Sequence, residues 1–223
     1  MVVKRNIVVA VSGASGAIYA RRILQGLNQP GIRTYLVISP AGRRLIHEEL
    51  GLEMADPHRL LGEESYGEII ALPVNDVGAC VASGSFKTHG MVVAPCSSNK
   101  LAQIAHGLGE NLITRAAQVA LKERRPLVLL HREMPLGLIE LRNMVRVTEA
   151  GAIVCPANPG FYLNPQTIED LVTMVAGRVL DLLGVEHGWK IRWSGAGGPT
   201  DTNTGGSAKS AAQIQGCGED TSW

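Results

Sequence analysis

A turn rich in serine and glycine follows an apolar run near the start of the chain, in the stretch VVAVSGASGAIYARRIL at residues 8–24. The free backbone N–H groups and the dipole at the start of a helix attract anions, so this pattern is typical of a phosphate-binding loop. The turn has neither the last glycine spacing of a dinucleotide fingerprint nor the Gly-Lys-Ser/Thr ending of a nucleotide-triphosphate loop. In any one such loop, serine and glycine can equally serve only to cap a helix and turn the chain.

Polar residues also follow four other apolar runs. In an open α/β sheet, ligands bind beyond the carboxyl ends of the strands, where the loops that follow the strands meet. Five loops would converge on one such rim, and together they favour a phosphorylated ligand over capping alone. They comprise residues 12–16, 39–40, 96–100, 132–133 and 158–162.

Two predicted helices carry cations that a phosphate could use. Arg115 and Lys122 stand seven residues apart, on one face of a helix whose apolar residues lie on another side. Charged residues on a helix face are more often simply solvated. Arg178 lies at the margin of the apolar stripe of the last helix, so it could point into the rim or into a subunit interface.

Apolar runs of strand length recur along the chain, and segments with helical periodicity separate several of them. This alternation is typical of a parallel sheet that is covered on both faces. We therefore predict an α/β fold with a doubly wound, mostly parallel sheet. The runs span residues 6–12, 33–39, 90–96, 126–131 and 152–157.

Two helices are predicted in more detail. Ala20, Ile23, Leu24 and Leu27 recur at helical spacing and predict an amphipathic helix after the first turn. The last helix should have an N-cap and first position at Asn164-Pro165 and should end at Gly184. Its apolar stripe would comprise Ile168, Leu171, Val172, Val175, Val179, Leu182 and Leu183.

Composition excludes several classes of protein. The 21 Lys and Arg residues balance 20 Asp and Glu residues, which disfavours nucleic acid or an anionic membrane surface as a partner. The four cysteines form no Cys-x-x-Cys pair and no apolar run is long enough for a membrane span, so we expect a reducing, cytoplasmic location. The six histidines have no metal-ligand spacing, and no metal site is predicted. After Trp193 the chain is rich in Gly, Ser and Thr.

Several segments resemble the UbiX family of flavin prenyltransferases, in order and nearly without gaps. They are GASGAIYA, SGSF before GMVVAPCS, RAAQVALKERRPLVLLHRE with a following PL, and FY through RVLDLLG to RWSG. The resemblance covers residues 4 to about 196. It implies a Rossmann-like flavoprotein domain at residues 1–196. The Gly-, Ser- and Thr-rich composition of residues 197–223 predicts a flexible tail.

The resemblance also implies an activity and an assembly. Such an enzyme binds reduced flavin mononucleotide (FMN) and joins a dimethylallyl group from dimethylallyl phosphate to flavin atoms N5 and C6. The prenylated FMN then serves a partner decarboxylase of the UbiD family. Members of the family are metal-independent and usually dodecameric. The choice between a monophosphate and a diphosphate donor stays open.

Site residues follow from the same resemblance. Glu133 would be an acid/base, Ser15 would relay a proton with Glu49, and Trp193 would either stabilise an allylic cation or anchor the chain end. Lys122, Tyr162 and Arg178 would bind the prenyl phosphate and stabilise its developing charge, Lys122 thereby sharing in catalysis. The flavin would be bound by Gly13, Ala14, Ser15, Ser39, Ser97, Ser98, Asn99, Lys100, Arg115 and Arg132.

Three positions depart from the family's pattern. Asn99-Lys100 stands where many members carry Lys-Thr, the segment NPGFY replaces the more usual PAFY pattern, and His131 stands where apolar residues are common. These departures lie in or beside the predicted flavin and prenyl sites.

Three other functions are possible for such a sequence, and its residues disfavour each of them. APCSSN resembles the signature of the flavin-dependent cysteine decarboxylases, but the position of their catalytic histidine is Val81 here, and His89 is not followed by isoleucine. A non-catalytic flavin-binding subunit would not need the second phosphate site that Lys122 and Arg178 suggest. A dehydrogenase is disfavoured because the second strand ends in VISPAG, without an acid for the ribose.

Overall fold

The structure is a computed structural model, and it describes residues 5–52, 57–62 and 66–192. All of its helices and strands belong to one compact unit, Met1–Ile191. The boundary predicted at residue 196 lies outside the described residues, so the division into a domain and a tail stays a prediction.

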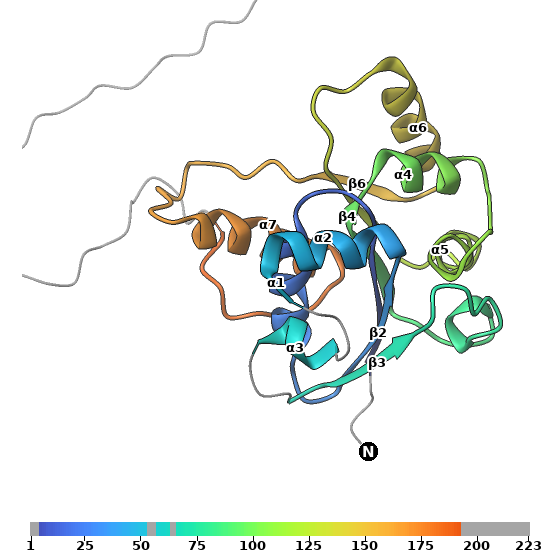
Figure 1. The fold of residues 1–223 in the computed structure, drawn as a ribbon, viewed down its shortest axis with the longest axis horizontal. Coiled ribbons are helices and arrows are strands. Elements are labelled where there is room, and N and C mark those ends of the chain that lie inside the picture. Colours follow the sequence, from blue (N-terminus) through green and yellow to red (C-terminus); the bar gives the residue numbers. More distant parts are fainter. Residues whose placement is uncertain (1–4, 53–56, 63–65, 193–223) are drawn as a thin grey trace, which may run out of the picture. The chain divides into compact units, whose positions relative to one another are not determined.

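A six-stranded parallel sheet forms the centre of this unit (Figure 1). The order β3-β2-β1-β4-β5-β6 reverses direction between β1 and β4, which is the doubly wound arrangement predicted from the sequence. The loops that follow β1 and β4 therefore leave the same edge in opposite directions, at the point where open α/β sheets generally bind ligands. The strands are β1 (Arg5–Val11), β2 (Ile32–Ile38), β3 (Glu68–Leu72), β4 (Gly90–Cys96), β5 (Leu127–His131) and β6 (Ile153–Pro156).

Helices cover both faces of the sheet, and Figure 1 shows α1 and α7 on one side with α5 on the other. Most of them follow a strand and run back along it, as right-handed crossovers require. They are α1 (Ala17–Leu27), α2 (Pro40–Leu50), α3 (Pro57–Leu61), the short 3-10 helix η1 (Cys80–Ala82), α4 (Ser98–Ala105), α5 (Leu112–Lys122), α6 (Leu138–Glu149) and α7 (Ile168–Leu182).

Two apolar cores result from the alternation of side chains along the strands. Ile7, Val9 and Val11 of β1 face the core shared with α1 and α7. Val8 and Ala10 face the core shared with α4 and α5. Because both faces are buried, the central strands are apolar at nearly every position, which is why their runs stand out in the sequence.

The edge strand β3 was not predicted. It has only five residues and pairs with β2 alone, and its residues are only partly buried, so its sequence EIIAL lacks the long apolar run of a central strand. Among the residues that the structure describes, no helix combines the length and apolar composition that a membrane span needs.

The predicted start of the last helix was wrong. The N-cap is Thr167, whose hydroxyl accepts a hydrogen bond from the backbone N–H of Asp170, while Asn164 has a left-handed backbone with φ of 51° and precedes the helix. Ile168 consequently lies in the first turn with 73% of its surface exposed, outside the apolar stripe. Asn-Pro and Thr-x-x-Asp are both start signals, and the capping box determined the boundary.

Candidate functional site

The loops after β1 and β4 are joined by a buried serine. The hydroxyl of Ser12 donates to the carbonyl of Pro95 at 2.8 Å and accepts from the backbone N–H of Ser97 at 2.8 Å. Ser12 is fully buried, so these two bonds satisfy groups that water cannot reach. The loops that follow β1 and β4 are therefore fixed to each other at the switch point of the sheet.

The first turn is built around glycines. Gly16 has φ of 118°, a conformation that side chains disfavour, and a Cβ on Gly13 would lie 2.5 Å from the Cβ of Ala41. Gly13 and Ser15 are exposed on this turn, and Ala14 is buried between them. The glycines thus let α2 approach the turn closely and leave part of its backbone open at the rim.

Glu49 occupies the start of α1. Its carboxylate accepts hydrogen bonds from the backbone N–H groups of Gly16 at 2.9 Å and Ala17 at 2.7 Å. A carboxylate at this position satisfies free donors and interacts favourably with the helix dipole. The helix N-terminus thus already holds an anion, and the predicted relay between Ser15 and Glu49 has no direct hydrogen bond among the described contacts.

Ser39 and Ser97 cap helices. The hydroxyl of Ser39 accepts from the N–H of Gly42, and that of Ser97 accepts from the N–H of Lys100. The helix-capping role that the sequence allowed for serine in these loops is therefore present at both positions. Their predicted contacts with a flavin remain predictions.

Arg132 and Glu133 extend from the end of β5 over the rim. The guanidinium of Arg132 donates to the carbonyl of Ser15 at 3.1 Å, which ties the fifth strand to the first loop. Glu133 is exposed, and its Oε2 atom accepts from the hydroxyl of Ser98 at 3.0 Å. Four of the predicted site residues, Ser15, Ser98, Arg132 and Glu133, thus meet at the rim.

Hydrogen bonding keeps Glu133 ionised. The hydroxyl of Ser98 and the backbone N–H of Met134 both donate to its carboxylate, and together with the charge of Arg132 they lower its pKa. The structure thus places an ionised, solvent-accessible carboxylate beside a fixed guanidinium.

Lys100 and Asn99 follow the rim into α4. Asn99 is exposed, whereas Lys100 is buried and its Nζ atom donates to Oε1 of Gln103 at 2.6 Å. Burial lowers the pKa of Lys100. Its ammonium group therefore contacts its own helix, and its backbone N–H belongs to the cap of Ser97.

Lys122 lies near the amino-terminal ends of the strands, whereas the rim lies at their carboxyl ends. It ends α5, five residues before β5 begins, and it pairs with Glu123 at 2.9 Å beside Gly84. Arg125 fixes the same loop by donating to the carbonyls of Gly84 and Phe86. A seven-residue strand such as β4 spans about 20 Å, so one chain does not bring Lys122 to Glu133. Arg115, in the first turn of α5, donates to the carbonyl of Ala82.

Tyr162 and Arg178 belong to the β6–α7 part of the fold. Tyr162 is 59% exposed on the loop before α7, and its ring lies against Gly160. Arg178 is exposed on α7, and its charge acts on Cys155 of β6. Trp193 lies outside the described residues, so its predicted role stays a prediction.

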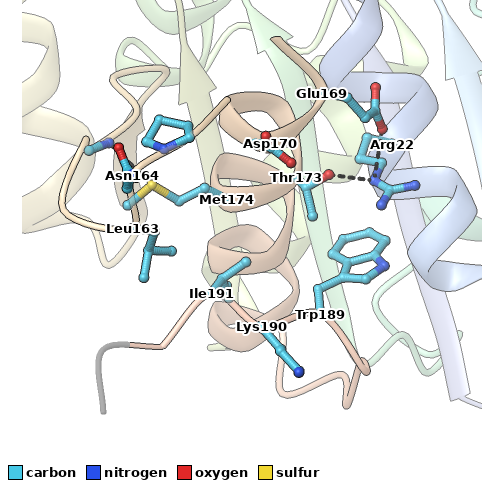
Figure 2. Close-up of a pocket in the computed structure, with 12 residues that line it drawn as sticks. Arg22, Leu163, Asn164, Glu169, Asp170, Thr173, Met174, Trp189, Lys190 and Ile191 are labelled. Atoms are coloured by element: carbon cyan, nitrogen blue, oxygen red, sulfur yellow. Dashed lines mark hydrogen bonds and ion pairs between the residues drawn. The ribbon is translucent and has the colours of Figure 1, made fainter. Parts of the chain in front are cut away.

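A cavity of about 470 Å³ lies beneath the loop that carries Tyr162, and none of the predicted site residues lines it (Figure 2). Figure 2 shows Arg22 of α1 reaching toward α7, where it bonds Thr173 at 3.0 Å and pairs with Glu169 at 3.2 Å. Its guanidinium also lies 4.3 Å from the ring of Trp189. The one arginine in this cavity thus already has an anionic partner, so we do not assign the phosphate site here.

Some determinants of the site were not predicted. The close approach of Ala41 to Gly13 depends on tertiary packing, and no local spacing signals it. The contact of Lys100 with Gln103 is local, because the two residues stand three apart on α4, a spacing that could have signalled it. In the described part of the chain, no three His, Cys, Asp or Glu side chains form a group that could hold a metal ion. Cys80, Cys96 and Cys155 are free thiols.

Comparisons with known proteins agree with this architecture. The family model for flavoproteins matches residues 1–180. The flavin prenyltransferase UbiX of Methanothermobacter thermautotrophicus is 44% identical over 195 residues, which cover 87% of this chain and 98% of the relative.

Two solved structures are similar over most of the chain. AnUbiX (PadA1), in complex with FMN and dimethylallyl pyrophosphate, has a TM-score of 0.74 and 40% identity and covers 84% of this chain and 100% of its own. A dodecameric FMN-dependent UbiX-like decarboxylase from Escherichia coli O157:H7 has a TM-score of 0.77 and 38% identity. Its match covers 85% of this chain and 100% of its own. Because its fold matches and its sequence is 44% identical to a UbiX enzyme over nearly the full length, the chain belongs to the UbiX flavin prenyltransferase family of flavoproteins.

Proposed function

We propose that this chain is a flavin prenyltransferase, which joins the dimethylallyl group of a prenyl phosphate to N5 and C6 of reduced FMN. The observation that carries the proposal is the 40% identity to AnUbiX, a protein crystallised with FMN and dimethylallyl pyrophosphate, over all of that chain. The product is prenylated FMN, which serves a UbiD-type decarboxylase.

The rim fits a flavin nucleotide. The exposed turn at Gly13 and Ser15 lies beside the loop of Ser97 and Ser98, and Arg132 links the two sides. The N–H groups of Gly16 and Ala17 already donate to Glu49. We therefore assign the flavin phosphate to the remaining donors of the turn and to the hydroxyl-rich loops around it.

The side chains at the rim divide the chemistry between them. Reduced FMN, when bound, supplies the nucleophilic ring atoms. Glu133 takes up or returns the protons that are exchanged during ring closure, because its carboxylate is ionised and exposed at the rim. Lys122, Tyr162 and Arg178 hold the phosphate and stabilise the negative charge that develops on it as the carbon–oxygen bond breaks.

The positions of these groups favour a site that is shared between copies of the chain. Lys122 lies at the edge of the sheet opposite Glu133, so we assign it to the site of a neighbouring copy. Assembly is also favoured by an apolar surface that follows Glu133, here called the α6 face. It comprises Met134, Leu136, Leu138, Ile139, Leu141 and Val145, whose exposed fractions run from 42% to 87%.

Two further assignments complete the proposal. Cytoplasmic location is supported by the free thiols Cys80, Cys96 and Cys155, which suit a reducing compartment.

Cysteine decarboxylation is disfavoured by the position of His89. Its Nδ1 atom accepts from the backbone N–H of Asn6 near the start of β1, at the edge of the sheet opposite the rim.

The proposal is tested by mass spectrometry of the flavin. The protein is mixed anaerobically with reduced FMN and dimethylallyl phosphate, and the FMN should gain one five-carbon prenyl unit. Glu133→Gln should retain FMN binding and form the adduct more slowly, by about 10²-fold, as expected for loss of an acid/base group.

Each negative result has a distinct meaning. Unmodified FMN with both the monophosphate and the diphosphate would overturn the proposal and favour a non-catalytic flavin-binding subunit. Full activity of the Glu133→Gln variant would retain the enzyme but remove Glu133 from the acid/base role.

A further inference from the structure

Three side chains at the rim form one hydrogen-bonded chain. Ser98, in the first position of α4, lies between His131 at the end of β5 and Glu133 two residues later. Its Oγ atom is 3.2 Å from Nε2 of His131 and 3.0 Å from Oε2 of Glu133. His131 is 3% exposed, whereas Glu133 is open to solvent. The serine thus connects a buried imidazole to the carboxylate at the surface of the rim.

The number of protons determines the direction of both bonds. A serine hydroxyl has one proton, and an ionised carboxylate can only accept. The hydroxyl of Ser98 therefore donates to Glu133, and its oxygen must accept the second bond from His131. This requires a proton on Nε2 of His131, so the neutral ring is the Nε2–H tautomer.

The surroundings keep the imidazole neutral. Burial is the largest influence on His131 and lowers its pKa, and the charge of Arg132 acts in the same direction. The carboxylates of Glu133 and Glu140 raise the pKa and only partly offset the burial. A neutral ring has a single N–H, which the geometry directs at Ser98.

His131 is also unusual for its strand. The other residues of β5, Leu127 to Leu130, are fully buried and apolar, as the interior of a parallel sheet requires. An apolar residue at position 131 would fill the same space but could not donate to Ser98. The hydroxyl would then be free to rotate away from Glu133.

We propose that His131 is a positioning residue, which fixes the hydroxyl of Ser98 as a donor to Oε2 of Glu133. The inference rests on the acid/base role proposed for Glu133. With Oε2 held by Ser98, the carboxylate stays ionised and keeps a fixed orientation at the rim. Among the residues that the structure describes, Oε1 accepts a longer bond from the N–H of Met134, at 3.3 Å, and is the oxygen left to take up a proton.

Three variants separate this role from simple packing. His131→Leu removes the donor, His131→Gln restores an N–H donor of similar reach, and His47→Leu is a matched control because His47 is exposed on α2. The first measurement uses FMN-free protein labelled with ¹⁵N-histidine. His131 should show the Nε2–H tautomer near neutral pH, and Ser98→Ala should change its signal. A cationic ring or the Nδ1–H tautomer would overturn the proposal.

The second measurement follows the carboxyl carbon of Glu133 in ¹³C-glutamate-labelled protein, assigned with Glu133→Gln. His131→Leu should raise the pKa of Glu133, His131→Gln should return it toward the original value, and His47→Leu should leave it unchanged. The acid limb of the pH profile for prenyl transfer should move to higher pH in parallel. An unchanged pKa of Glu133 in His131→Leu would reduce His131 to a packing residue. Both spectroscopic readings need no turnover, so failure of the proposed activity would not be confused with failure of this inference.

Discussion

Glu49 acts on the backbone of the first turn, and this contact can be tested apart from catalysis. Glu49→Gln removes the negative charge and one acceptor oxygen from the side chain that accepts from Gly16 and Ala17, so the start of helix α1 loses its favourable charge interaction. We expect a loss of about 1 kcal/mol, which lowers the melting temperature by about 2–4 °C in a domain of this size.

Glu48→Gln is the matched control for this prediction. Glu48 pairs with Arg44 on the exposed face of α2, and such pairs contribute little to stability. Its melting temperature should stay close to that of the unchanged protein in the same thermal scan. If Glu49→Gln instead melted normally and only slowed prenyl transfer, the proton relay with Ser15 would be the better account.

The proximity of residues at strand ends was predictable where the fold alone brings them together. Ser15, Ser98, Arg132 and Glu133 follow three different strands, and the parallel sheet brings them to one rim. The backbone partners of Glu49 were not predictable in this way. Whether a charged side chain reaches a ligand or a nearby backbone group depends on distances of a few ångströms, which residue spacing does not determine.

The start of α7 depends on its capping box. The hydroxyl of Thr167 accepts from the N–H of Asp170, and the carboxylate of Asp170 accepts from the N–H of Thr167. Thr167→Ala should destabilise the protein by about 1 kcal/mol, because the N–H of Asp170 loses its partner. The free energy of unfolding by urea measures this change.

Thr148→Ala is the control for the helix start. Thr148 is exposed near the end of α6, where its hydroxyl bonds the carbonyl of Met144 one turn earlier. Alanine has the higher helix propensity there, so the substitution should be neutral or slightly stabilising. Equal destabilisation by both substitutions would show that Thr167 acts by something other than capping.

The four inner strands were predictable because both of their faces are buried. The apolar runs of β1, β2, β4 and β5 stand out because helices cover both sides of them. Of the two edge strands, β6 is only partly buried but still lies in a predicted apolar run, and β3 does not. The edge strand β3 has a single neighbouring strand, so its sequence is under weaker constraint. At α7 two start signals competed, and only tertiary context distinguishes Asn164 from Thr167 as the cap.

The α6 face is expected to be an interface between copies of the chain. Ile139→Glu places a charge on this face and should reduce the mass of the assembly measured by light scattering after gel filtration. Ile168→Glu is a closely matched control, because Ile168 is equally exposed, at 73%, in the first turn of α7. An unchanged mass for Ile139→Glu would place the interface elsewhere.

Sharing of the site between copies has a more specific consequence. Lys122 ends α5 at one edge of the sheet, and Glu133 follows β5 at the other. The proposed shared site therefore takes Lys122 from one copy and Glu133 from another. Lys122→Ala and Glu133→Gln should each lose most activity when assembled alone. Co-expressed in equal amounts, they form mixed assemblies in which about a quarter of the sites receive both intact side chains.

The formation of prenylated FMN by these mixed assemblies, compared with each variant alone, decides the question. Recovery of about a quarter of the unmodified activity is expected if neighbouring copies complete the site. A site built within one chain would always contain one defect, because every chain carries a substitution, and mixing would then recover nothing. Ile139→Glu in both variants should abolish the recovery if the α6 face holds the contributing copies together.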